Sequence, residues 1–99
     1  MSDDFIIPPF QPDSAIGTLR RNLRDLSLAE REGQMELRGQ PVAQLAVDGA
    51  TISARLARRL SRAPEWDRFT LKDHADVRRF SDELRKRLAR WSDARGDDS

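Results

Sequence analysis

Residues 34–49 read QMELRGQPVAQLAVDG, and this stretch decides the fold because its apolar residues follow the two-residue period of a β-strand. Met35 and Leu37 alternate with polar residues, and residues 42–47 form a second apolar run. Two such runs joined by a short polar connection are typical of a β-hairpin. The stretch therefore predicts a pair of antiparallel strands.

Turn residues stand at both ends of the second run. Gly39 and Gln40 suit a tight turn whose first position needs a positive φ. Pro41 has no N–H to donate to a neighbouring strand, so we place it at the start of the second strand or on the edge of the sheet. Asp48 and Gly49 suit the turn that ends the hairpin.

Residues 50–62, ATISARLARRLSR, have an ambiguous pattern. Ile52, Leu56 and Leu60 fit a spacing of four as well as a spacing of two. Most residues of the segment are Ala, Leu and Arg, which are strong helix formers. We therefore expect a second helix that ends before Pro64.

The C-terminal part predicts a third strand and a last helix. Residues 65–71, EWDRFTL, alternate as a short strand does, and Asp73 can cap the helix that follows, with Asp76 in its first turn. One apolar stripe at steps of three and four then marks the helix. It consists of Val77, Phe80, Leu84, Leu88 and Trp91.

Another apolar stripe precedes the hairpin and predicts a first helix of about four turns. It consists of Ile16, Leu19, Leu23 and Leu26, with Asp13 or Ser14 as the cap. Residues 26–32 either continue this helix or begin an extended segment, and Gly33 stops both.

The predicted order is α-β-β-α-β-α, an α+β fold in which about three helices cover a small antiparallel sheet made of the hairpin and the third strand. We expect residues 1–12 to form an extended, apolar and proline-rich N-terminal segment, residues 13–92 a single domain, and residues 93–99 a disordered acidic tail. The stretch from Leu37 to Leu56 is suggestive of many small bacterial modules and diagnostic of no family.

Catalytic parts are scarce in this sequence. The chain of 99 residues has no cysteine, and His74 is its only histidine, so no second His or Cys can complete a metal shell with it. The five glycines do not have the spacing of a phosphate-binding loop. We expect a protein that is not an enzyme and that uses no cofactor, no metal and no small-molecule substrate.

Two features bear on where the chain works. No apolar run approaches the ~20 residues that cross a bilayer, so we expect no contact with a membrane. The acidic start MSDD lacks the basic region of a signal peptide. These features, with the absence of cysteine, lead us to expect a cytoplasmic protein.

Four arginines form the first candidate binding surface. On the predicted second helix they fall at steps of three, one and three, without an acidic residue in that helix; they are Arg55, Arg58, Arg59 and Arg62. Such a stripe is either a solvated face or a surface for phosphates or an acidic protein. The sequence leaves both interpretations open.

The N-terminal stretch FIIPPF, residues 5–10, is the second candidate surface. Its prolines exclude a helix, yet it carries bulky apolar side chains, namely Phe5, Ile6, Ile7 and Phe10. We prefer the interpretation that the segment covers the protein's own core, and docking onto a partner or a second copy is the alternative.

These observations lead to one functional expectation. We expect a small protein-interaction or regulatory module that forms a homodimer through an open sheet edge or docks on a protein partner. The alternative is an accessory nucleic-acid-binding protein that uses the arginine stripe.

Overall fold

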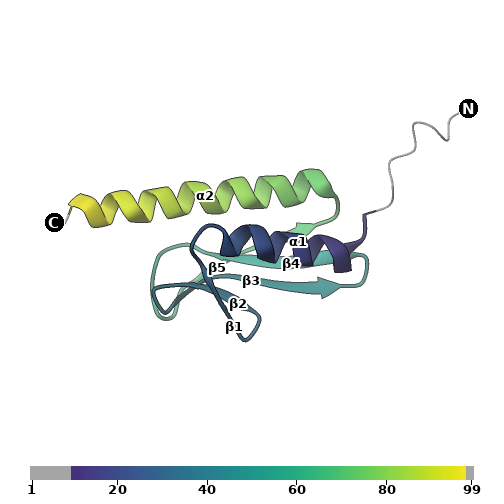
Figure 1. The fold of residues 1–99 in the computed structure, drawn as a ribbon, viewed down its shortest axis with the longest axis horizontal. Helices are drawn as coiled ribbons and strands as arrows, with labels where there is room; N and C mark the ends of the chain where they lie inside the picture. Colours follow the sequence, from purple (N-terminus) through teal and green to yellow (C-terminus); the bar gives the residue numbers. More distant parts are fainter. Residues whose placement is uncertain (1–9, 98–99) are drawn as a thin grey trace, which may run out of the picture.

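The computed structural model describes the backbone of residues 10–97 and the side chains of residues 10–91. The described chain consists of α1 (Pro12–Arg24), β1 (Ala29–Arg31), β2 (Gln34–Leu37), β3 (Gln40–Asp48), β4 (Thr51–Ala57), β5 (Trp66–Leu71) and α2 (His74–Asp97). The five strands form one antiparallel sheet in chain order, β1-β2-β3-β4-β5. Figure 1 shows both helices on the same side of this sheet.

The α+β class predicted from the sequence is confirmed, but the predicted order is wrong. The described chain has two helices and five strands, in the order α-β-β-β-β-β-α. The predicted second helix is strand β4, an interior strand of the sheet that pairs with β3 on one side and β5 on the other. Ile52, Ala54 and Leu56 are fully buried on one side of this strand. This burial between two paired strands outweighs the helix propensity of Ala, Leu and Arg.

The predicted hairpin is confirmed, with its turn one residue earlier than expected. Arg38 and Gly39 are the central residues between β2 and β3, with φ of 55° and 82°. Two positive φ values are the signature of the tight turn that suits the twist of a hairpin. Pro41 lies near the start of β3 beside a register shift at Met35/Glu36, where its missing N–H is tolerated.

The first helix carries three of the four residues of its predicted stripe, since Leu26 lies after its end at Arg24, and its start differs from the expected cap. Ile16, Leu19 and Leu23 are buried against the sheet. The helix begins at Pro12, whose fixed φ suits the first helical position, and neither Asp13 nor Ser14 caps it. In the segment 26–32, whose conformation the sequence leaves open, Leu26 and Ser27 form a turn after the helix, and Ala29–Arg31 form β1 with Leu28 buried just before it.

The third strand and the last helix are confirmed. Asp73 accepts a hydrogen bond from the backbone N–H of Asp76 at 2.8 Å, as a helix cap does. Phe80 and Leu84 are fully buried, and the outer members of the stripe pack against the same core. The backbone of α2 continues through residue 97, into the range 93–99 expected as a tail. Neither of the two described helices is long and apolar enough to cross a membrane.

Candidate functional site

The side of the sheet opposite the helices is the candidate site, because no described element packs on it (Figure 1). Side chains on β4 alternate between the two sides: Ile52 and Ala54 are buried toward the helices, whereas Ser53 and Arg55 lie on the other side. We call this other side the outer face. Its uncovered position makes it available to a partner.

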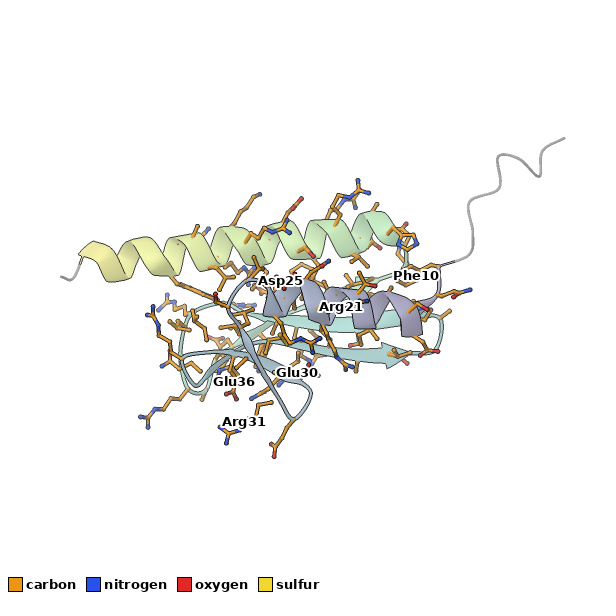
Figure 2. The ribbon with its side chains drawn as sticks, in the orientation of Figure 1. Phe10, Arg21, Asp25, Glu30, Arg31 and Glu36 are labelled. Atoms are coloured by element: carbon orange, nitrogen blue, oxygen red, sulfur yellow. The ribbon has the colours of Figure 1, made fainter. Side chains whose placement is uncertain are left out.

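Five side chains, one from each strand, line up across the outer face. In the observed register they are Arg31, Gln34, Gln44, Arg55 and Arg68, and we call them the outer row. Figure 2 shows Arg31 on the side of the sheet away from the helices. Neighbouring strands lie about 4.8 Å apart, so each member of the row is within reach of the next.

Hydrogen bonds hold the middle of the outer row. The Gln44 Nε2 donates to Gln34 Oε1 at 3.1 Å, and the Gln34 Nε2 donates to Glu36 Oε2 at 3.0 Å. Glu36 is 9% exposed, so this relay starts on the central strand β3 and ends on a nearly buried carboxylate. The relay fixes which way both amides point.

Arg55 and Arg68 stand directly opposite each other on β4 and β5. No carboxylate of the described residues lies within ion-pair distance of either guanidinium. Like charges that face each other across two strands destabilise a sheet. This pair is therefore a cost to the fold, which an anion placed between the two side chains would remove.

A shallow depression of about 380 Å³ lies on the outer face beside this pair. Glu32 and Gly33 border it at the β1–β2 turn, and Arg55 borders it on β4, with Gln34 and Gln44 between them. Opposite charges thus stand at opposite borders, with amide groups in the middle.

The four-arginine stripe predicted from the sequence does not exist, because the segment is not a helix. Only Arg55 lies on a strand, where it is half-buried on the outer face. Arg58, Arg59 and Arg62 belong to the loop between β4 and β5 and are exposed. Arg58 is already engaged: its Nε lies 2.7 Å from Asp67 Oδ1 and its Nη1 lies 3.8 Å from Glu65 Oε2.

Arg87 of α2 joins the last helix to the sheet at this end. Its side chain is 12% exposed and lies 2.9 Å from Asp67 Oδ2 and 2.9 Å from Glu83 Oε2. It also donates to the carbonyl oxygen of Ala57 at 3.0 Å. Arg58, Asp67, Glu83 and Arg87 therefore form a structural network on the helix side, separate from the outer row.

Arg87→Met is expected to lower the free energy of unfolding by about 1.5–3 kcal/mol, because it removes three charge-assisted hydrogen bonds from a nearly buried group. Urea denaturation would measure this loss. Arg87→Lys keeps the charge and loses the planar guanidinium that makes paired hydrogen bonds, so its free energy of unfolding should lie between those of the wild type and Arg87→Met. Equal stability of all three proteins would contradict the structural role.

The same network makes the free energy of unfolding depend on pH in the acidic range. The pKa of Asp67 is held below its usual value, chiefly by a hydrogen bond from Arg58. The hydrogen bond and the charge of Arg87 act in the same direction, and desolvation acts against them. The stabilisation is present above about pH 4, the ordinary aspartate pKa, and is lost as the pH falls through the lowered value. Between pH 5 and pH 2 the unfolding temperature of the wild type should therefore fall more steeply than that of Asp67→Asn. Plots of unfolding temperature against pH that run parallel for the two proteins would refute this.

The second surface predicted from the sequence is described only at Phe10. Phe10 is half-buried, packs against the core and meets the ring of His74 edge-to-face, with centroids 5.3 Å apart. Phe5, Ile6 and Ile7 lie outside the described residues. His74 is exposed in the first turn of α2, and the residues that the structure describes contain no group of three His, Asp or Glu that could hold a metal ion.

Sequence reasoning missed most of the outer row. Arg68 alternates with Phe69 within the predicted third strand, so the sequence indicates that the two side chains lie on opposite sides of it, but the sequence predicts a helix for its neighbour Arg55. The sequence correctly predicts a strand for Gln44, but only the register of the sheet shows that Gln44 lies beside Arg55.

Arg68→Glu should stabilise the fold by about 0.2–1 kcal/mol, since it converts a repulsive cross-strand pair into an attractive one. Thermal unfolding at low salt would detect the change. Arg68→Gln, which only removes the repulsion, should give a smaller gain. A loss of stability in both variants would show that the two arginines do not repel each other.

No protein-family model matches this chain, and the searches of curated proteins and of solved structures gave no match either.

Proposed function

We propose that this chain is a non-enzymatic protein-interaction module that docks on a protein partner through the outer face of its sheet. The observation that supports this most is the facing pair Arg55 and Arg68. The pair lies on an uncovered surface, and no carboxylate of the described residues is within ion-pair distance of it. A fold-destabilising pair on an open face is typical of a site kept for binding. Arg and Trp are also enriched at interface hot spots, and the half-buried Trp66 is on the same side of β5 as Arg68.

Docking on a different protein is favoured over the homodimer expected from an open sheet edge. Strand β5 carries Asp67 pointing toward the helices, where Arg87 holds it, and β1 is only three residues long. An inward-pointing charge and a short strand are two ways in which proteins protect sheet edges. Two copies that met through their outer faces would bring arginines together, which opposes self-association there.

A protein partner is also favoured over nucleic acid. Glu32 and Glu36 lie beside the outer row and would repel a continuous phosphate backbone. Sheets that read single-stranded RNA stack two or three bases on aromatic side chains, whereas Trp66 is the one aromatic residue at an outer position of these five strands.

Photo-crosslinking in the host cell tests this proposal. A crosslinking amino acid at Thr70, which is exposed on the outer face, should trap a protein of one defined mass, whereas the same group at Arg78 on α2 should not. Adducts to RNA or DNA from Thr70 would support the nucleic-acid alternative instead. Adducts between two copies would point to a dimer, and the absence of any adduct at Thr70 would reject the proposal.

A further inference from the structure

We infer that Arg55 and Arg68 form an anion subsite that takes a carboxylate side chain, Asp or Glu, from an acidic polypeptide segment of the partner, and that Gln44 beside them accepts a hydrogen bond from an N–H of the same segment. This inference rests on the proposed function and names the chemistry of the partner. Its three residues come from three adjacent strands and are directly opposed in register. No part of the subsite belongs to the network that joins α2 to the sheet.

The two arginines can converge on one anion. Residues that face each other on neighbouring strands have Cβ atoms about 5 Å apart, so both guanidinium groups can reach the two oxygens of a single carboxylate. Arg55 is half-buried in the sheet face, which limits the freedom it would lose on binding, and Arg68 is exposed beside it. A carboxylate between them would replace the repulsion by two charge-assisted contacts.

Gln44 supplies the feature that distinguishes a polypeptide from a phosphate chain. Its Nε2 is committed to Gln34, and among the described residues no donor is bonded to its Oε1. The subsite thus places an acceptor oxygen next to the cationic donors of Arg55. A polypeptide carries N–H donors close to its carboxylates and can use both groups, whereas a phosphodiester backbone offers only acceptors.

The neighbouring depression limits how the acidic segment continues. Beyond Gln34 its border is Glu32, so a run of negative charges that extended across all five strands would meet a carboxylate. The segment that fits has its acidic residues over β4 and β5 and a polar or basic residue over the β1–β2 turn. The outer row therefore favours one direction of the bound chain.

A binding experiment with the full chain tests the subsite. The probe is a fluorescein-labelled peptide of four glutamates followed by four serines, so that its acidic part can lie over β4 and β5 without a charge at Glu32. A short duplex DNA is the comparison ligand, and both are measured by anisotropy at two salt concentrations. The test variant Arg55→Gln/Arg68→Gln should bind the peptide at least about tenfold more weakly than the wild type, because two charge-assisted contacts are lost. The wild type should prefer the peptide to the DNA.

The control removes the same two charges elsewhere. Arg78 and Arg90 are exposed on α2 and make no ion pair with a described residue, so Arg78→Gln/Arg90→Gln should change peptide affinity less than about twofold. An equal loss in the control, no saturable peptide binding, or tighter binding of DNA would overturn the inference. Gln44→Leu should weaken peptide binding and leave DNA binding unchanged, and an equal loss for both probes would also count against it.

The outcome can be separated from that of the proposed function. If the protein adduct formed from Thr70 persists in cells when Arg55 and Arg68 are both replaced by Gln, the docking face stands and the carboxylate subsite is wrong. If the adduct disappears with that variant and persists with the α2 control, the subsite is supported. If no adduct forms in any protein, both proposals fail.

Discussion

Phe80→Ala is expected to lower the free energy of unfolding by about 3–5 kcal/mol, a large part of the stability of a domain of this size. Phe80 is 1% exposed and is the largest of the fully buried side chains. Its ring meets Phe69 of β5 edge-to-face, with centroids 5.5 Å apart, so the substitution removes an aromatic pair as well as apolar volume. Because α2 contacts the sheet mainly through β5, the cavity would open where the helix is held.

Urea denaturation followed by circular dichroism would measure this effect. Phe80→Leu keeps most of the apolar volume and should cost markedly less than the alanine variant. Val77→Ala, at a half-buried position of the same stripe, should cost less than Phe80→Ala too, because less area leaves the core. A loss below about 1 kcal/mol for Phe80→Ala would mean that the helix is not docked as the structure shows.

The elements that the sequence predicts well are those whose apolar residues fit one period only. The stripe of α2 fits a helix and no strand, and the residues 34–47 fit paired strands, so both were predictable from spacing. Gly39 is recognisable as a turn residue because it stands between two runs of strand period, and its observed φ of 82° is one that glycine adopts readily. Local chemistry was sufficient in each of these regions.

Strand β4 was not predictable in the same way, for a physical reason. Ile52 and Leu56 are four residues apart, a spacing that a helix and a strand share, and the intervening Ala54 and Arg55 have high helix propensity. What decides the conformation is hydrogen bonding to β3 on one side and to β5 on the other, which depends on residues far away in the chain. The candidate site depends on the same pairing, because Gln44, Arg55 and Arg68 meet only in that register.

Ala54→Glu gives the sharpest test of this assignment, and we expect it to unfold the protein. Ala54 is fully buried on the helix side of β4, opposite Leu45 on β3 and Phe69 on β5. A glutamate there would place an unpaired carboxylate in the core, a change that costs more than about 4 kcal/mol.

The helix predicted from the sequence gives the opposite expectation for the same variant. Two residues after Ile52, position 54 would lie about 200° around that helix and so on its solvent side, where glutamate would change stability by less than about 0.5 kcal/mol.

Ser53→Glu is the matched control, because Ser53 is exposed on the outer face and tolerates a charge in the strand. Far-ultraviolet circular dichroism and thermal unfolding of the two variants distinguish the strand from the helix. Loss of the fold in Ala54→Glu but not in Ser53→Glu identifies a strand whose Ala54 side packs against the helices. A stable Ala54→Glu protein would contradict the assignment of β4 as a strand between β3 and β5, and with it the register that places Arg55 beside Arg68.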